Sequence, residues 1–211
     1  PIHKVEREEK VVAFTFDVSK TDKDLDKVLE VLNKYNIKAS FFVTGAWVDN
    51  NPEELKKIAS YDHDIGNHGD NHKHMDLLSK EECEKEIMYL HNKVKKITGV
   101  EMNLFRPPYG DYNNILMYTA NNLGYHSIKW SIDSEDWKDY SPNDIIKKCR
   151  KEDTLDTGSI ILFHTGTKFT IEALEEVVLF FIDQNYSLVP VSELIYLDDY
   201  TVDMSGIQKK K

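Results

Sequence analysis

Short apolar segments suited to β-strands alternate with amphipathic helical patterns along almost the whole chain, and this alternation constrains the fold most strongly. Strict strand–helix alternation implies a parallel sheet covered by helices. About seven repeats favour a closed or nearly closed barrel, although periodicity alone does not separate a barrel from a doubly wound open sheet. The expected strands span residues 11–16, 39–43, 64–67, 104–105, 127–131, 160–163 and 187–189, and the expected helices span residues 23–35, 52–60, 79–98, 113–123, 142–150 and 171–185.

The bulk composition is that of one folded domain. The chain has 211 residues, of which 40% are hydrophobic and 30% charged, enough for a single large core. Its net charge of −10 argues against a nucleic-acid partner, because phosphates need a basic surface. No apolar run approaches the roughly 20 residues that a membrane-spanning helix needs, so we expect no membrane span in this chain.

The two ends and the cysteines lead to further expectations. Residues 1–10 contain a run of charges, so they are predicted to form a charged N-terminal extension or linker, with a domain over residues 11–200 and a tail over residues 201–211. Cys83 and Cys149 both fall in helical segments and allow one disulfide or none. We expect two unpaired cysteines, since a core of this size needs no covalent staple.

Polar residues follow five of the predicted strands directly. Asp17, His68, Arg106, Asp133 and His164 each come at or just beyond the end of an apolar run. Because the carboxyl ends of parallel strands share one face of the sheet, these five side chains should converge at one mouth. Such convergence is typical of an active site.

Each of these residues also has a structural interpretation. His68 and His72 stand four apart, so a helical turn would place both imidazoles on one face, where they suit a single metal ion. A histidine pair of this kind is more often solvated surface, and a lone His164 after a buried strand is more often a core residue. Asp17 can be a strand-end cap, and Arg106 a surface cation. Their common position after strands favours the catalytic interpretation.

Five segments together resemble the signature of the polysaccharide deacetylases, also described as the NodB-homology family or family 4 carbohydrate esterases. They are residues 11–17, residues 65–72, the run Arg106-Pro107-Pro108-Tyr109-Gly110, residues 133–137 and residues 162–164. The resemblance covers residues 11–197, nearly the whole chain. It implies an α/β fold, an irregular (β/α)7-type barrel in a single domain.

The resemblance also implies roles for individual residues. Asp17 would be the general base, held ionised by Arg106, and His164 the general acid, supported by Asp136 or alternatively by Asp133. His68 and His72 would bind a divalent metal, most naturally zinc, with cobalt or nickel fitting the same ligands. The remaining assignments are the backbone N–H of Tyr109 as an oxyanion donor, and Trp137 and Leu162 as apolar walls for the acetyl methyl group.

Two positions depart from the family pattern. Val18 stands where the family has a second aspartate as metal ligand, and Gly69 stands where a Ser or Thr usually follows the first histidine. Catalytic zinc sites normally have three protein ligands plus water, and an isopropyl group supplies none. Three outcomes are open: Asp70, Asp22 or another oxygen substitutes, waters complete a weaker site, or the metal has been lost.

The implied activity is metal-dependent hydrolysis of N-acetyl groups, or alternatively O-acetyl groups, on a polysaccharide. Peptidoglycan or a chitin-like polymer of N-acetylglucosamine or N-acetylmuramic acid is the expected substrate, and the composition favours a bacterial cell-wall role. We expect a monomer that acts outside the cell or in the cell envelope, with a signal or anchor lost before Pro1. The rival hypotheses are a metal-deficient glycan-binding homologue without catalysis, and an amidase acting on a small non-sugar C–N bond.

Overall fold

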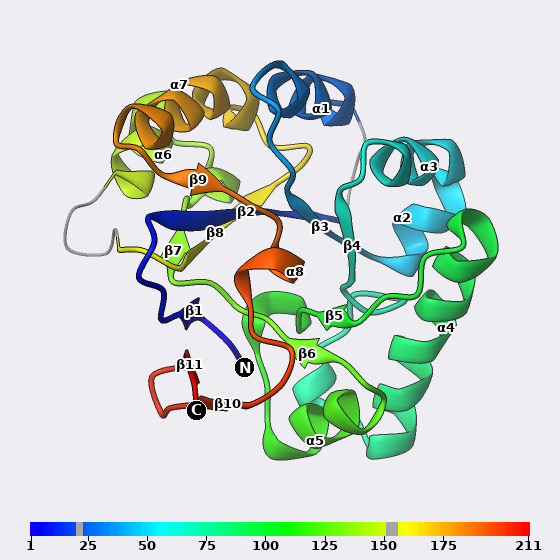
Figure 1. The fold of residues 1–211 in the computed structure, drawn as a ribbon. Coiled ribbons are helices and arrows are strands. Elements are labelled where there is room, and N and C mark those ends of the chain that lie inside the picture. Colours follow the sequence, from blue (N-terminus) through cyan, green and yellow to red (C-terminus); the bar gives the residue numbers. More distant parts are fainter. Residues whose placement is uncertain (20–22, 151–155) are drawn as a thin grey trace.

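The computed structural model, which describes residues 1–19, 23–150 and 156–211, has a curled sheet surrounded by helices (Figure 1). The strand order is β10-β11-β1-β8-β2-β3-β4-β5-β6, with β7 beside β8 and β9 beside β2. The strands from β8 through β6 pair in parallel, as strand–helix alternation predicts. The strands of the described chain are β1 (Lys4–Val5), β2 (Val11–Val18), β3 (Ser40–Val43), β4 (Asp64–Asn67), β5 (Leu104–Phe105), β6 (His126–Ser127), β7 (Ile132–Asp133), β8 (Ser159–His164), β9 (Ser187–Leu188), β10 (Tyr200–Val202) and β11 (Ile207–Lys210).

The six predicted helices are present with ends shifted by only one or two residues at most sites. Local capping explains the start of α4: the Ser79 side chain accepts a hydrogen bond from the backbone N–H of Glu82, and the Glu82 carboxylate accepts one from the backbone N–H of Ser79. Two short helices and three 3₁₀ turns were not predicted, because they are too brief to show a period. The helical bounds are α1 (Leu25–Lys34), α2 (Gly45–Asn50), α3 (Pro52–Ser60), η1 (Met75–Leu77), α4 (Lys80–Thr98), η2 (Pro108–Gly110), α5 (Asn114–Asn122), η3 (Asp136–Lys138), α6 (Pro142–Cys149), α7 (Thr170–Asp183) and α8 (Val191–Leu194).

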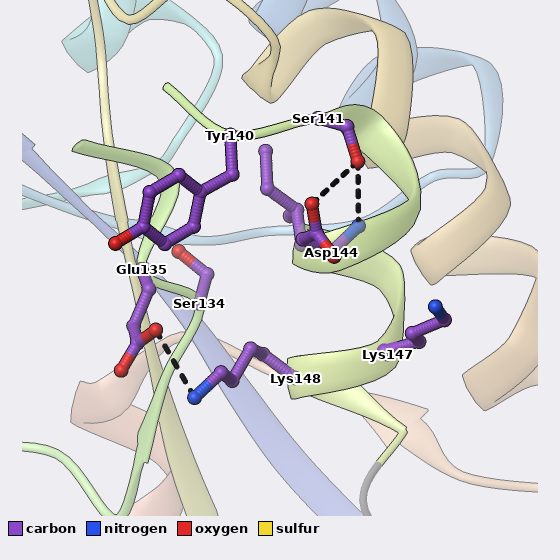
Figure 2. Close-up of a pocket in the computed structure, with 8 residues that line it drawn as sticks. Ser134, Glu135, Tyr140, Ser141, Asp144, Lys147 and Lys148 are labelled. Atoms are coloured by element: carbon purple, nitrogen blue, oxygen red, sulfur yellow. Dashed lines mark hydrogen bonds and ion pairs between the residues drawn. The ribbon is translucent and has the colours of Figure 1, made fainter. Parts of the chain in front are cut away.

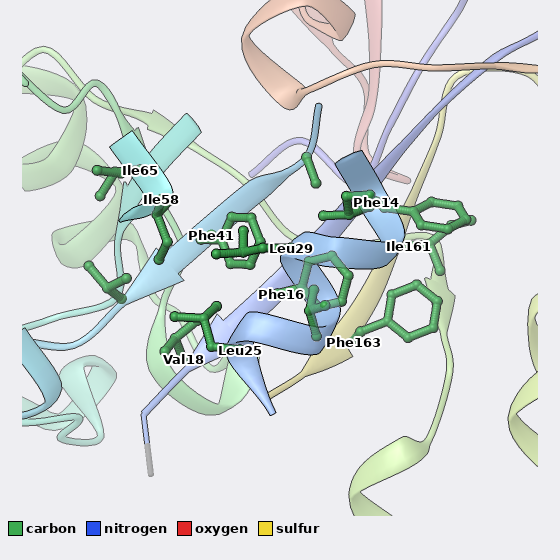
Figure 3. Packing of buried hydrophobic residues seen from close by; sticks show 14 of the residues in the cluster. Phe14, Phe16, Val18, Leu25, Leu29, Phe41, Ile58, Ile65, Ile161 and Phe163 are labelled. Atoms are coloured by element: carbon green, nitrogen blue, oxygen red, sulfur yellow. The ribbon is translucent and has the colours of Figure 1, made fainter. Parts of the chain in front are cut away.

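Alternation along the strands builds an apolar cluster on each face of the sheet. The outer cluster lies between the sheet and the helices and includes Phe14, Phe16 and Val18 of β2 (Figure 3). The inner cluster fills the curled sheet near the start of the strands, where Ala13 and Ile160 pack with residues of α8. Apolar packing therefore occupies one end of the curled sheet and leaves the carboxyl ends of the strands for polar side chains.

The N-terminal segment belongs to the fold, so its prediction as a linker is wrong. Ile2 and Val5 are only 2% and 0% exposed, and β1 pairs with both β8 and β11. The Ile2 N–H donates to the carbonyl of Ser127 at 2.7 Å, which connects this segment to the strand at the other end of the parallel series. The segment thus bridges the gap that β8 and β6 would otherwise leave open. The charged run at residues 6–10 obscured the two apolar residues that precede it.

The C-terminal residues 201–211 are likewise not a free tail, since β10 and β11 form an antiparallel hairpin beside β1. Both chain ends consequently lie together at one side of the molecule (Figure 1). Cys83 and Cys149 are buried and unpaired, as expected. Within the described part of the chain, no helix combines the length and apolar character required to cross a membrane.

Candidate active site

Strand pairing brings the predicted acid and base to adjacent positions. Asp17 of β2 and His164 of β8 form the last pair between these two strands and stand directly opposite each other in register. Arg106 follows β5 and His68 follows β4, at the same end of the sheet. The convergence expected from the strand ends is therefore present for these four side chains.

Asp17 and Arg106 form a buried ion pair. The Arg106 Nη1 atom donates to Asp17 Oδ1 at 2.8 Å, and the two residues are 0% and 5% exposed. Burial alone would raise the pKa of Asp17, but the charge of Arg106 and smaller contributions from two histidines outweigh it and hold the pKa below its ordinary value. Asp17 is therefore ionised at neutral pH.

The guanidinium of Arg106 is fixed on three sides. Its Nη2 atom donates to the Lys129 carbonyl at 3.0 Å, and its Cζ atom lies 4.1 Å from the ring centroid of Phe42. The ring of Trp130 lies at 5.5 Å. This cage aims the fork of the guanidinium at Asp17, which a freely rotating surface arginine would not do.

His164 is held by Asp136. The imidazole Nδ1 lies 2.8 Å from Asp136 Oδ1, and the His164 backbone N–H donates to Asp136 Oδ2 at 2.7 Å. Since the carboxylate can only accept, Nδ1 carries the proton and Nε2 faces away from Asp136. Burial lowers the pKa of His164, but the hydrogen bond to Asp136 and the charge of Asp17 outweigh it and leave the pKa raised.

Of the two aspartates left open by the sequence, Asp136 contacts His164. The Asp133 carboxylate instead accepts from the backbone N–H of Glu135 at 2.8 Å and adds only a smaller charge effect at His164. Asp136 is fully buried, and the hydroxyl of Thr170 donates to its Oδ2 at 2.6 Å. Three donors thus fix this carboxylate in place.

His68 and His72 present neutral imidazoles side by side. His68 Nδ1 lies 2.8 Å from the Arg106 carbonyl, which can only accept, so the proton is on Nδ1 and the Nε2 lone pair is free. That Nε2 atom lies 3.4 Å from Asp17 Oδ2, and the His68 and His72 ring centroids are 4.9 Å apart. Burial lowers the pKa of His68, and it lowers the pKa of His72 to about 4.

The conformation of the loop between His68 and His72 depends on the glycine at position 69, where the family pattern usually has Ser or Thr. Gly69 has a φ of +77°, a conformation that disfavours any residue with a Cβ atom, and its N–H donates to the Asn67 side chain at 3.0 Å. His72 itself has a φ of +52°. The asparagine side chain therefore helps to shape the loop, a role for which the family pattern uses a hydroxyl group.

Val18 faces away from this site. It follows Asp17 in the same strand, so its side chain points to the opposite face of the sheet, where it is fully buried in the outer apolar cluster with Leu25 and Leu29 (Figure 3). The position occupied by the family's second aspartate is thus filled by hydrocarbon packing between β2 and α1.

Asp70, one of the expected substitutes for that aspartate, has other partners. Asp70 Oδ1 pairs with Lys93 at 2.8 Å, and its Oδ2 accepts from Asn71. Asp22 lies outside the described residues. Among the residues that are described, the His, Cys, Asp and Glu side chains that bring three ligand atoms within 4.8 Å of one another are His74, Asp76 and Asp111. Among the described residues, His68 and His72 thus remain the two candidate ligands at this position, one fewer than catalytic zinc normally has.

Tyr109 lies at the rim of the mouth in a strained conformation. Its φ is +61°, uncommon for a residue with a side chain, and the stiff Pro107-Pro108 pair precedes it. The ring is 54% exposed and packs against His74 and His72, with centroids 3.9 Å and 4.6 Å away.

The two predicted apolar walls differ in exposure. Leu162 is 2% exposed and precedes His164 by two residues, so it shares the inner face of β8. Trp137 is 55% exposed and follows Asp136 directly in η3. One side chain is thus part of the packed floor and the other stands free at the surface.

A separate hollow of about 310 Å³ lies between η3 and α6 (Figure 2). Its walls include Glu135, Tyr140 and Lys148, and Glu135 pairs with Lys148 at 3.0 Å. None of the residues discussed above as acid, base or metal ligand lines it. The candidate acid, base and metal ligands therefore lie at the strand ends, apart from this hollow.

Three supports of the site were not predicted from the sequence. Thr170 stands just before the helix at residues 171–185, which suggests only a capping role, and Phe42 and Asn67 have the pattern of ordinary strand residues. His63 was not predicted to be buried either, yet it is 7% exposed and accepts a hydrogen bond from the Ala39 N–H at 3.2 Å. Its partner is a backbone group, which no side-chain pattern reveals.

Comparisons with known proteins agree with this architecture. A sequence profile described as polysaccharide deacetylase matches residues 4–128. The chain is 30% identical over 196 residues to the peptidoglycan-N-acetylmuramic acid deacetylase PdaA of Bacillus subtilis, covering 89% of this chain and 72% of PdaA. It is 33% identical over 196 residues to a peptidoglycan-N-acetylglucosamine deacetylase of Bacillus cereus, covering 90% of this chain and 91% of that protein.

Other similar proteins are longer or differ in activity. The chain is 32% identical to the uncharacterized protein YlxY of Bacillus subtilis, covering 92% of this chain but only 60% of YlxY. The solved structure of BA3943 from Bacillus anthracis, described as a CE4 family pseudoenzyme, superimposes with a TM-score of 0.88 at 27% identity, covering 100% of this chain and 70% of BA3943. A mutant of BA3943 is described as having restored enzymatic activity.

Fold, profile and relatives point to the same group of hydrolases. The chain belongs to the polysaccharide deacetylase family, the family 4 carbohydrate esterases.

Proposed function

We propose that this chain removes acetyl groups from the N-acetyl sugars of peptidoglycan in the bacterial cell envelope. The proposal rests mainly on two groups at adjacent strand ends, an ionised carboxylate that can accept a proton and an imidazole whose raised pKa favours the protonated form. Arg106 holds Asp17 ionised, and Asp136 holds His164 with a raised pKa. An amide hydrolase needs a base for the attacking water and an acid for the departing amine. These two groups meet that need.

Each step uses groups of the chain itself. Asp17 accepts the proton of the water that attacks the acetyl carbonyl, and the Tyr109 backbone N–H donates to the oxygen on which negative charge develops. His164 Nε2 then donates its proton to the amine nitrogen as the C–N bond breaks. Trp137 and Leu162 enclose the acetyl methyl group.

His68 and His72 are the proposed protein ligands of a divalent metal, zinc or alternatively cobalt or nickel. The free Nε2 lone pair of His68 and the lowered pKa values of both histidines suit them to this role. Such an ion would supply Lewis-acid polarisation of the acetyl carbonyl and acidify bound water. The two-ligand set predicts weaker metal binding than that of a site with three protein ligands.

Product analysis tests the proposal. Purified peptidoglycan is incubated with the wild-type protein and with His164→Ala in zinc-containing buffer, digested to muropeptides and examined by mass spectrometry. We expect acetyl loss with the wild type alone, and fragmentation identifies which sugar loses it. The named relatives include deacetylases of both N-acetylglucosamine and N-acetylmuramic acid. Fully acetylated products from the wild type would contradict the proposal.

A second candidate is a glycan-binding relative without catalysis. The burial of Val18 in the outer apolar cluster favours it, because the position of a metal-ligand aspartate is used for packing. The similarity to a CE4 pseudoenzyme is consistent with it. Sedimentation of the protein with insoluble peptidoglycan, without any acetate release, would favour this candidate over the enzyme.

A further inference from the structure

A second group of metal-ligand side chains lies beside the mouth. His74 directly precedes the first 3₁₀ turn, η1, Asp76 belongs to it, and Asp111 directly follows the second, η2. One ligand atom from each lies within 4.8 Å of the others, and His74 Nδ1 is 3.7 Å from Asp111 Oδ2. Three ligands from two separate turns therefore converge without any contribution from His68 or His72.

The Asp76 carboxylate supplies an independent indication of a ligand. Its Oδ1 atom is buried and has no hydrogen-bond partner among the described residues. A buried carboxylate oxygen without a donor is costly, so such atoms usually have a proton, a water or an ion as partner. The backbone around it is fixed, since the Asn113 side chain donates to the Asp76 carbonyl at 2.6 Å.

The chemistry of these ligands selects the class of ion. Two carboxylates and one imidazole neutralise a doubly charged cation, and this mixture of oxygen and nitrogen suits zinc or manganese better than a thiolate-preferring metal. His74 is exposed, so an ion in solution can reach its imidazole.

We propose that His74, Asp76 and Asp111 form a second divalent-metal site, which preferentially binds zinc and fixes the Tyr109 ring at the rim of the mouth. The His74 ring stacks on that of Tyr109 with centroids 3.9 Å apart and planes inclined by 9°. The Tyr109 ring in turn packs against His72. Binding at His74 therefore ties η1 and η2 together across the aromatic contact that borders the mouth.

Zinc binding by the full chain tests the proposal without reference to activity. The measurement is equilibrium dialysis against zinc, with metal analysis, on a His68→Ala/His72→Ala background that removes the other imidazoles. We expect this background to retain one zinc ion per chain. Adding His74→Ala or Asp111→Asn should weaken the remaining binding by about tenfold or more, because each removes a direct ligand. Asp183→Asn, an exposed and equally charged change on α7, is the matched control.

The same comparison without the background substitutions covers a failure of the double variant to fold. In the otherwise wild-type chain, Asp111→Asn should lower the zinc stoichiometry by one relative to Asp183→Asn. The proposal is overturned if the folded background binds no zinc, or if Asp111→Asn and Asp183→Asn give the same binding curve and stoichiometry. Deacetylation is not measured, so the result is independent of the proposed function.

Discussion

Asp17 and Val18 are neighbours in the chain but face opposite sides of β2. The first points to the mouth and pairs with Arg106, while the second packs under α1. Successive side chains of a regular strand point to opposite faces of the sheet, and β2 is regular through Val18. Asp17 and Val18 therefore cannot both face the mouth. Replacing the family's aspartate by valine therefore removes a ligand and adds a packed hydrocarbon group in one step.

Val18→Asp tests this division. A carboxylate in the outer apolar cluster has no partner, so we expect the free energy of unfolding at neutral pH to fall by about 3 kcal/mol or more. Burial would raise the pKa of the new carboxyl group, so the loss should grow as pH rises through the carboxyl range. Urea denaturation at several pH values measures it, with Val18→Thr as the uncharged control. Wild-type stability would mean that the new side chain turns into the mouth, where it would raise zinc affinity instead.

Asp136→Asn tests the support of the general acid. A protonated His164 is required, so activity should fall as pH rises through its pKa, and loss of the Asp136 charge lowers that pKa. The basic limb of the kcat profile should therefore move to lower pH, with a reduced maximum because the amide disturbs the His164 tautomer. Asp133→Asn, which leaves the hydrogen bond to His164 intact, should shift the limb less. If the basic limb moved equally in the two variants, the pKa of His164 would depend only on nearby negative charge and not on its hydrogen bond to Asp136.

At the scale of elements, α4 positions the histidine loop. Glu86 of α4 is buried and accepts from the Asn71 backbone N–H at 2.8 Å and from its side-chain amide at 3.0 Å. It also pairs with Lys73 at 2.8 Å. Burial alone would raise the pKa of Glu86, but these donors outweigh it and leave the pKa lowered. The loop that carries His72 is thus attached to a long helix through one carboxylate.

Glu86→Ala should release this loop. We expect the free energy of unfolding to fall by about 2 kcal/mol, the cost of leaving part-buried donors unpaired, and the Asn71 amide to exchange faster with solvent. Urea denaturation and hydrogen exchange measure the two effects. Glu84→Ala, on the same helix but less buried, should stay within about 0.5 kcal/mol of the wild type. Unchanged exchange at Asn71 would show that other contacts hold the loop.

Long helices and strands could be predicted from the sequence because they are long enough to show a periodic pattern, whereas very short ones could not. Strands with long apolar runs, such as β2 and β8, and helices with clear stripes, such as α1 and α4, were predicted from the sequence. The strand predicted over residues 127–131 is only His126–Ser127 in the structure. The two-residue strands β1 and β7 have no period to detect. Their positions depend on partners far along the chain.

At the scale of the whole molecule, the first residues bridge the two edges of the parallel series of strands. Ile2 forms a parallel bridge with Ile128, which directly follows β6, and β1 pairs with β8. Local sequence could not predict this closure, since it depends on partners more than 100 residues away. The convergence of Asp17 and His164, by contrast, was predictable, because parallel strands place their carboxyl ends together whatever their separation in the chain.

Ile2→Ala measures the contribution of this closure. Ile2 is 2% exposed, so truncation should lower the free energy of unfolding by about 2–5 kcal/mol, the usual cost of deleting a buried aliphatic side chain. Thermal or urea denaturation measures the loss. Glu8→Ala, in the charged part of the same segment, should change stability by less than about 0.5 kcal/mol. If both variants lowered the free energy of unfolding by similarly small amounts, the segment would contribute little to the stability of the fold, as expected of a linker.

Acetate release from peptidoglycan, measured for the wild type and His164→Ala with zinc in excess, tests the central claim most directly. Circular dichroism first establishes that both proteins are folded. The account predicts steady release by the wild type and a rate at least about 100-fold lower for the variant, the usual contribution of a general acid. Equal rates for the two proteins, or no release by a wild type that binds peptidoglycan, would contradict it.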